Sequence, residues 1–96
     1  MSKYPLNVLP LTLVKNSYTY VQVSREERYA IYRQCTGQKT IAFEVFRVKI
    51  QKERTFRDRL FPRKEVFPSN EDFGYTAYSC RSLEDAHKRL EYLKNR

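Results

Sequence analysis

The sequence predicts an α+β fold, in which an antiparallel sheet of about four strands carries one C-terminal helix on one face. Two observations predict it. Segments rich in Tyr, Val, Ile and Phe recur between short polar turns, as antiparallel strands do, and one segment near the C-terminus repeats its leucines at helical spacing. The length of 96 residues suits a single domain. Its predicted parts are an N-terminal arm over 1–16, the sheet over 17–80 and the helix over 82–95.

The N-terminal third predicts an arm and two strands. Pro5 and Pro10 prevent a helix in the arm, whose residues 11–15 are a candidate short strand. Residues 18–25 alternate between two faces, and residues 28–35 are rich in β-forming side chains. Polar turns at 26–27 and 36–38 end these strands.

Residues 40–52 form the longest predicted strand, and its apolar phase breaks in the middle. Apolar side chains occupy odd positions up to Val45 and even positions from Phe46 onward. A regular strand cannot place both sets on one face. Either a bulge near Val45 and Phe46 shifts the register, or the two ends of the strand are covered on different faces.

Residues 53–72 show no sustained period and predict a basic loop within the sheet region. Pro62 and Pro68 interrupt it, residues 65–67 are a candidate for brief pairing, and the polar cluster 69–72 predicts a turn. Residues 75–80 predict a last short strand.

The C-terminal segment predicts an amphipathic helix. Ser82 with Asp85 resembles a capping box, and one apolar stripe follows, formed by Leu83, Ala86, Leu90 and Leu93. A lone amphipathic helix is marginal in water, so the stripe must lie on the sheet. The opposite face of the sheet is then open unless a loop, the N-terminal arm or a second copy covers it.

The composition favours a polyanionic partner and gives little support to catalysis. The net charge of +8 draws nucleic acid, anionic lipid or an acidic protein surface. His87 borders the apolar stripe and is expected to be structural. With two glycines and no zinc-type ligand spacing, the chain predicts no phosphate loop, no metal, no cofactor and no enzyme activity.

Cysteine usage and hydropathy predict a cytoplasmic protein with no membrane partner. The most apolar stretch, residues 6–14, is broken by Pro10 and is shorter than the roughly 20 residues of a spanning helix. No export signal is recognised, so Cys35 and Cys80 are expected to be reduced thiols.

Positive charge concentrates in residues 47–64, where eight of eighteen residues are Lys or Arg. Cations follow phosphates, and aromatic rings stack on unpaired bases. The predicted nucleic-acid site comprises Arg47, Lys49, Lys52, Arg54, Arg57, Arg59, Arg63 and Lys64, together with Phe56 and Phe61. Tyr18, Tyr20 and Tyr32 would add stacking positions if the open face of the sheet is the platform. The alternative is a solvated loop whose phenylalanines anchor it to the core.

The run EVFPSNEDFG at 65–74, followed by YTAYSCRSLEDAHKRL, resembles small uncharacterised proteins from phages and mobile elements of gut Bacteroidetes. The similar part covers about the latter two-thirds of the chain. The resemblance implies a phage or mobile-element origin. It implies no activity and carries no functional residues across.

The sequence therefore predicts a small basic module that binds nucleic acid without sequence specificity, with single strands as the expected form. The alternative is a phage or mobile-element accessory protein that acts by protein–protein interaction. Such a protein would self-associate, for instance as a homodimer, or dock on an acidic surface of a host complex.

Overall fold

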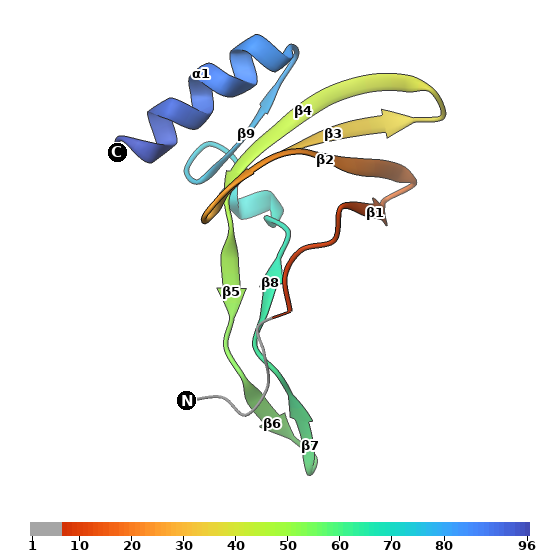
Figure 1. Cartoon of the computed structure of the whole chain (residues 1–96). Coiled ribbons are helices and arrows are strands. Elements are labelled where there is room, and N and C mark those ends of the chain that lie inside the picture. The colour runs from red at the N-terminus through yellow and green to blue at the C-terminus, as the bar shows by residue number, and fades with distance from the viewer. Residues whose placement is uncertain (1–6) are drawn as a thin grey trace.

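The computed structural model describes residues 7–96, which form an antiparallel sheet with a helix packed against it (Figure 1). The sheet has five strands in the order β1-β2-β3-β4-β9. Their bounds are β1 Thr12–Lys15, β2 Tyr18–Glu26, β3 Tyr29–Thr36, β4 Lys39–Arg47 and β9 Ala77–Cys80, and the helix α1 spans Leu83–Lys94. The predicted α+β fold is confirmed, and the candidate strand at 11–15 is β1. The first six residues of the predicted arm lie outside the described residues.

The helix covers one face of the sheet as predicted. Its N-terminus is capped by Ser82, whose Oγ accepts a hydrogen bond from the backbone N–H of Asp85 at 3.1 Å. The buried side of the helix consists of Ala86, Leu90 and Leu93, which pack with Ile31 and Val45 of the sheet. His87, expected to be structural, is exposed to solvent.

The opposite face of the sheet is covered by the chain itself. Tyr20, Tyr32 and Phe46 pack there with Leu9 from the N-terminal segment and Phe67 from the segment after β8. Tyr20 is 5% exposed and Tyr32 is 0% exposed. The expectation that these two tyrosines form a stacking platform is therefore wrong, because the face that carries them is part of the core.

Coverage on both faces explains the broken apolar phase of β4. Val45 and Phe46 are both fully buried, Val45 against the helix and Phe46 against the opposite cluster. Both residues pair in regular register with β3. The register shifts instead at Ile41, which the pairing skips: Cys35 pairs with Thr40, and Gln34 pairs with Ala42. Of the two alternatives, coverage on different faces is confirmed, and the described strands show no bulge at Val45 and Phe46.

The prediction of a basic loop over 53–72 is wrong for most of its length. The chain leaves the sheet after Arg47 and runs out through β5 (Lys49–Gln51) and β6 (Arg54–Phe56), then returns through β7 (Arg59–Phe61) and β8 (Lys64–Val66). β5 pairs with β8 and β6 pairs with β7, so residues 48–66 form a two-stranded arm (Figure 1). The predicted strand over 40–52 is therefore divided between the sheet and this arm. A short 3-10 helix, η1 (Asn70–Asp72), occupies the predicted polar turn.

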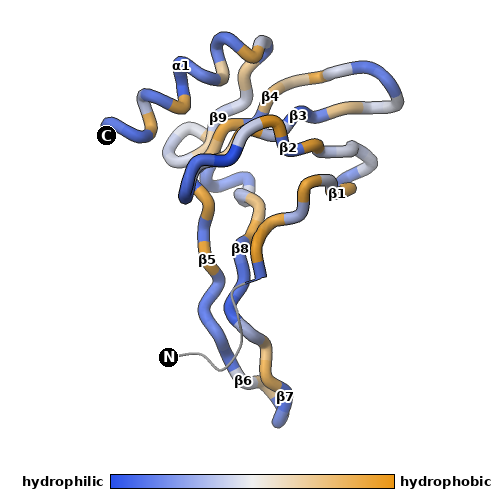
Figure 2. The backbone as a smooth tube through the Cα atoms, viewed as in Figure 1, coloured by the Kyte–Doolittle hydropathy of each residue, from blue (hydrophilic) through white to orange (hydrophobic). Residues whose placement is uncertain are grey.

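A tight turn at Arg57 and Asp58 makes the arm possible. Both residues have positive φ angles, 52° and 62°, as in the two-residue type I′ turns that suit the twist of a hairpin. The arm projects away from the sheet, and its outer part is mainly hydrophilic apart from an apolar stretch on β7 (Figure 2).

Over residues 7–96, no helix has the length and apolar character needed to cross a membrane.

Candidate nucleic-acid interface

The structure places the ten residues of the predicted nucleic-acid site on the arm or at its base. Arg47 ends β4, where the arm begins, and the others follow along both strands of the arm. They are Lys49 on β5, Lys52 between β5 and β6, Arg54 and Phe56 on β6, Arg57 in the turn, Arg59 and Phe61 on β7, Arg63 between β7 and β8, and Lys64 on β8. All eight cations are exposed.

The register of the outer arm gathers two cations and two rings on one face. Arg54 lies opposite Phe61, and Phe56 lies opposite Arg59. Because directly opposed residues and alternate residues of a strand share a face, these four side chains point to the same side. We call them the arm face. The pair of Thr55 and Leu60 points to the other side.

The arginines of the outer arm stack on its phenylalanines. The guanidinium carbons of Arg54 and Arg59 lie 5.4 and 5.5 Å from the ring centroid of Phe61. That of Arg57 lies 5.2 Å from the ring centroid of Phe56. Each such contact stabilises an exposed pair by about 0.5–1 kcal/mol. It orients the guanidinium group while leaving its N–H donors available for an anion.

The arm face continues toward the base of the arm. A groove of about 360 Å³ is lined by Arg54 and Phe61 of the outer arm and by Gln51 and Lys64 of the inner arm, with Asn7 and Pro62 beside them. Gln51 pairs with Lys64 across β5 and β8, so both lie on one face. Cationic and aromatic side chains therefore follow one surface along the length of the arm.

The arm carries many more cations than acids. Lys49 forms an ion pair with Asp72, with its Nζ 3.2 Å from the carboxylate oxygen. Over residues 47–64, eight Lys and Arg residues oppose two acids, Glu53 and Asp58. This surface thus keeps a concentrated positive potential for a polyanion.

An ion pair that the sequence analysis missed anchors the inner arm to the sheet. Arg25 of β2 donates to both carboxylate oxygens of Glu65 on β8, at 2.8 and 2.5 Å, and the backbone N–H of Leu9 donates to the same carboxylate at 2.9 Å. The hydrogen bond from Arg25 lowers the pKa of Glu65 below its ordinary value. The partners are forty positions apart in the sequence, so no local sequence signal indicates this contact.

The other titratable groups considered as site residues are acidic, histidine and cysteine side chains. Within residues 7–96, no group of three or more His, Cys, Asp or Glu side chains is placed to hold a metal ion. Cys35 and Cys80 are free thiols, and burial raises the pKa of the Cys80 thiol. Glu44 is buried on β4, its Oε2 has no hydrogen-bond partner among the described residues, and desolvation raises its pKa. The absence of enzyme activity stays a prediction.

The chain matches no protein-family model, and no curated protein or solved structure is significantly similar to it. Its function must therefore be argued from the arm and its chemistry.

Proposed function

We propose that this protein binds nucleic acid without sequence specificity, and that the arm is its main contact surface. The observation that carries the proposal is the arm face, where exposed arginines alternate with the exposed Phe56 and the partly buried Phe61 on a ribbon that projects from the sheet (Figure 1). Cations that follow the backbone and rings that stack on bases are the two components of a nonspecific nucleic-acid site.

Packing in the core of the sheet does not account for these two rings. Phe56 is 60% exposed, and neither it nor Phe61 belongs to the two hydrophobic clusters of the sheet. β6 and β7 pack on each other and make no extensive contact with another described helix or strand. A two-stranded hairpin of this kind is only marginally stable in water. The alternative of a solvated loop whose phenylalanines anchor it to the core is therefore disfavoured.

Single strands fit the arm face better than a duplex does. An unpaired base exposes its ring for stacking on Phe56 or on the guanidinium planes of Arg54 and Arg59, whereas bases in a duplex stack on one another. The ten residues from Val48 to Arg57 reach roughly 30 Å at strand rise, so the arm can contact several nucleotides at once. Backbone charge and ring faces are common to all sequences, which explains the lack of specificity.

A fluorescence anisotropy titration with a labelled oligothymidylate of about twenty nucleotides tests the proposal. If four to six phosphates are engaged, the logarithm of the association constant should fall with the logarithm of salt concentration with a slope of roughly −3 to −4. A duplex of the same length should bind more weakly. Equal binding to polyglutamate, which offers charge without bases, would refute the proposal.

A second candidate function is docking on another protein, and exposed apolar side chains near β1 favour it. Val8, Leu11 and Val14 are 68%, 71% and 74% exposed. Val8 and Leu11 line a hollow of about 550 Å³, together with Leu9, Pro10, Gln22 and Arg25. Apolar exposure of this kind is typical of an interaction surface, including one for a second copy. Such a role suits an accessory protein of a phage or mobile element, and an apparent mass that rises with concentration in light scattering would support it.

A further inference from the structure

The two edges of the sheet, β1 and β9, differ in what lies beside them (Figure 1). We propose that β1 is a pairing surface for β1 of a second copy of this chain, so that two sheets join into one continuous antiparallel sheet. We call the contact between the two β1 strands the seam. The inference rests on the second candidate function, docking on a protein, and identifies both the partner and the way it binds.

The backbone of β1 presents hydrogen-bonding groups on its outer side. The carbonyl oxygen of Leu11 accepts a hydrogen bond from the backbone N–H of Gln22 on β2 at 2.8 Å. In an antiparallel pair, residues that exchange such bonds alternate with residues that do not. Leu11 and every second residue after it therefore direct their backbone groups toward β2, whereas those of Thr12 and Val14 point away from the sheet. Within residues 7–96, no strand pairs with β1 on that side.

A two-fold arrangement of two copies pairs these outward groups with one another. An axis that passes between the two copies of Leu13 places Thr12 of each copy opposite Val14 of the other. Each of these residues can then exchange its N–H and C=O with its counterpart. The same register sets Leu13 directly opposite its copy, in the kind of pair whose side chains approach most closely. Because Leu13 packs against the core cluster of the sheet, the seam extends an apolar surface that already exists.

The low charge of β1 favours a second copy as the partner. The chain carries a net charge of +8, so most surfaces of two copies repel each other. Residues 11–14 contain no charged side chain. The Nζ of Lys15 donates to the carbonyl oxygen of Pro68 at 3.3 Å and lies 5.4 Å from the ring centroid of Phe67, so this charge is directed toward the core. Charged side chains commonly protect edge strands from pairing, and the outer side of β1 lacks this protection.

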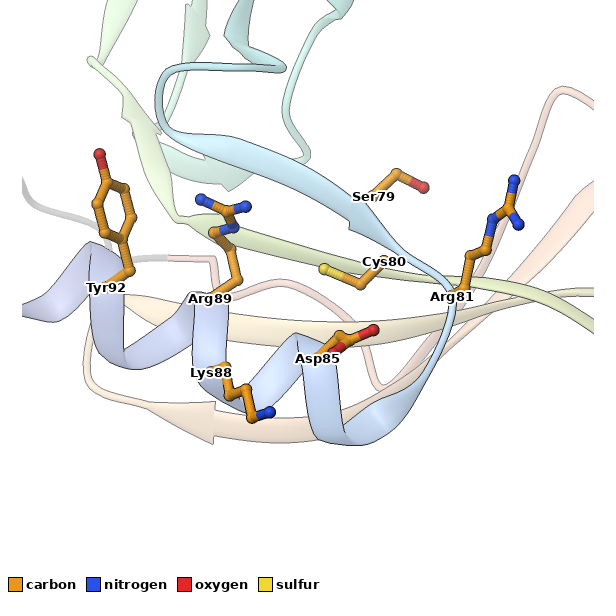
Figure 3. A pocket seen from close by; sticks show the side chains of 7 residues that line it. All are labelled: Ser79, Cys80, Arg81, Asp85, Lys88, Arg89 and Tyr92. Carbon is orange, nitrogen blue, oxygen red and sulfur yellow. The ribbon is translucent and has the colours of Figure 1, made fainter.

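The edge at β9 is less suited to pairing, because its own loop occupies part of it. The backbone N–H of Arg47 donates to the carbonyl oxygen of Thr76, so Ala77 and Ser79 are the residues of β9 that point outward. The carbonyl oxygen of Ala77 accepts a hydrogen bond from the N–H of Gly74 at 2.8 Å. The charged residues that line the hollow between β9 and α1 are Arg81, Asp85, Lys88 and Arg89 (Figure 3). Since all but one of these are cations, a second copy placed there would bring like charges together.

The seam is small, so the dimer should be weak. β1 has four residues, and a contact of this size lies below the roughly 1,200 Å² that stable interfaces bury. Two exposed apolar side chains, Leu11 and Val14, offset part of the cost of association. We therefore expect a dissociation constant on the order of 10–100 μM.

Analytical ultracentrifugation of the full chain from about 5 to 500 μM tests the inference. We expect an apparent mass that rises with concentration from that of one chain toward that of two. Thr12→Pro removes an outward N–H without breaking a bond to β2, so it should weaken self-association at least tenfold. The matched control Thr12→Val keeps this N–H and should self-associate like the unmodified chain. If Thr12→Pro fails to fold, Val14→Lys places a charge in the seam and should give the same loss.

Amide hydrogen exchange tests the register of the seam. The N–H of Val14 should exchange severalfold more slowly at about 500 μM than at about 5 μM, because it is bonded only in the dimer. The N–H of Leu13 points toward β2, so its exchange should not depend on concentration. An equal response of the two amides would overturn the proposed pairing.

A chain that stays monomeric up to about 500 μM would overturn the inference. Self-association that Val8→Lys abolishes and Thr12→Pro leaves unchanged would also overturn it, because the apolar hollow lined by Val8 would then be the contact. That second result would still support docking on a protein. The variant Arg54→Gln/Arg59→Gln should self-associate like the unmodified chain, which separates the seam from nucleic-acid binding by the arm.

Discussion

Replacing Arg54 and Arg59 with glutamine removes two positive charges from the arm face and leaves the sheet untouched. Both side chains are exposed, and both contact the ring of Phe61. Surface substitutions usually change the free energy of unfolding by less than about 0.5 kcal/mol. The loss of two exposed cation–π contacts affects only the outer arm. The variant should therefore fold normally and bind nucleic acid more weakly.

The size of the binding loss follows from counterion release. Each phosphate contact with a single strand contributes about 0.7 to the slope of log K against log salt. Losing two contacts should make the slope shallower by about 1.4. At 0.1 M salt this corresponds to a fall of about 25-fold in the association constant, or about 2 kcal/mol.

The assay is the anisotropy titration repeated between 50 and 200 mM salt. The matched control is Arg33→Gln/Lys39→Gln, which changes the net charge by the same amount at two exposed positions on β3 and β4. This control should lose less than about threefold, since long-range attraction is screened over roughly 10 Å. Equal losses in the two variants would show that binding follows net charge, and the argument for the arm would then be wrong.

Three further substitutions test other steps of the reasoning. Phe56→Ala should weaken single-strand binding by about 1–3 kcal/mol without changing the salt slope, because the ring contributes stacking and no charge. Glu44→Met should raise the free energy of unfolding at neutral pH by about 1–3 kcal/mol in urea titrations, because it removes a buried, desolvated carboxylate oxygen that lacks a partner. Glu65→Gln should lower the free energy of unfolding at neutral pH by about 1–3 kcal/mol, because Arg25 loses its anionic partner.

The two buried carboxyls should give opposite pH dependences. The pKa of Glu65 is lowered in the folded chain, so its stabilising contribution is complete above the ordinary glutamate value and is lost as the pH falls through the folded pKa. The pKa of Glu44 is raised, so its penalty grows as the pH rises from the ordinary value through the folded pKa. Urea titrations from pH 3 to 7 measure both. A Glu44→Met variant with unchanged pH dependence would contradict the assignment to Glu44.

Much of the sheet and the helix could be predicted because buried and exposed side chains alternate along them with a regular period. The stripe ending in Leu90 and Leu93 can only be explained by a helix lying on an apolar surface. The outer arm gave no such signal, since nearly all residues of β6 and β7 are exposed and no alternation is imposed on them. Its turn also uses Arg57 and Asp58, where Asn and Gly would have indicated a hairpin.

The candidate site was predictable in composition but not in arrangement. The sequence identifies the cations of residues 47–64, yet the position of the turn alone decides that Arg54 and Arg59 share a face with Phe56. Tyr20 and Tyr32 were misjudged for a related reason. Alternation shows that a tyrosine lies on a particular face, but only tertiary packing shows that Leu9 and Phe67 cover that face. The pairing of Arg25 with Glu65 likewise depends on the position of the whole arm.

The ion pair between Arg25 and Glu65 fixes the inner arm to the sheet but does not hold the outer arm. The inner arm is tied to the sheet through Glu65 and Leu9, whereas the outer arm rests on its own hairpin. Glu65→Gln should therefore weaken nucleic-acid binding as well as stability, since an arm that samples more orientations must be ordered when it binds. The cations are unchanged, so the salt slope should stay the same, in contrast to the variant that lacks Arg54 and Arg59. If Glu65→Gln alters the salt slope instead, the ion pair of Arg25 with Glu65 affects the number of phosphate contacts. The argument that this ion pair only orients the arm would then be wrong.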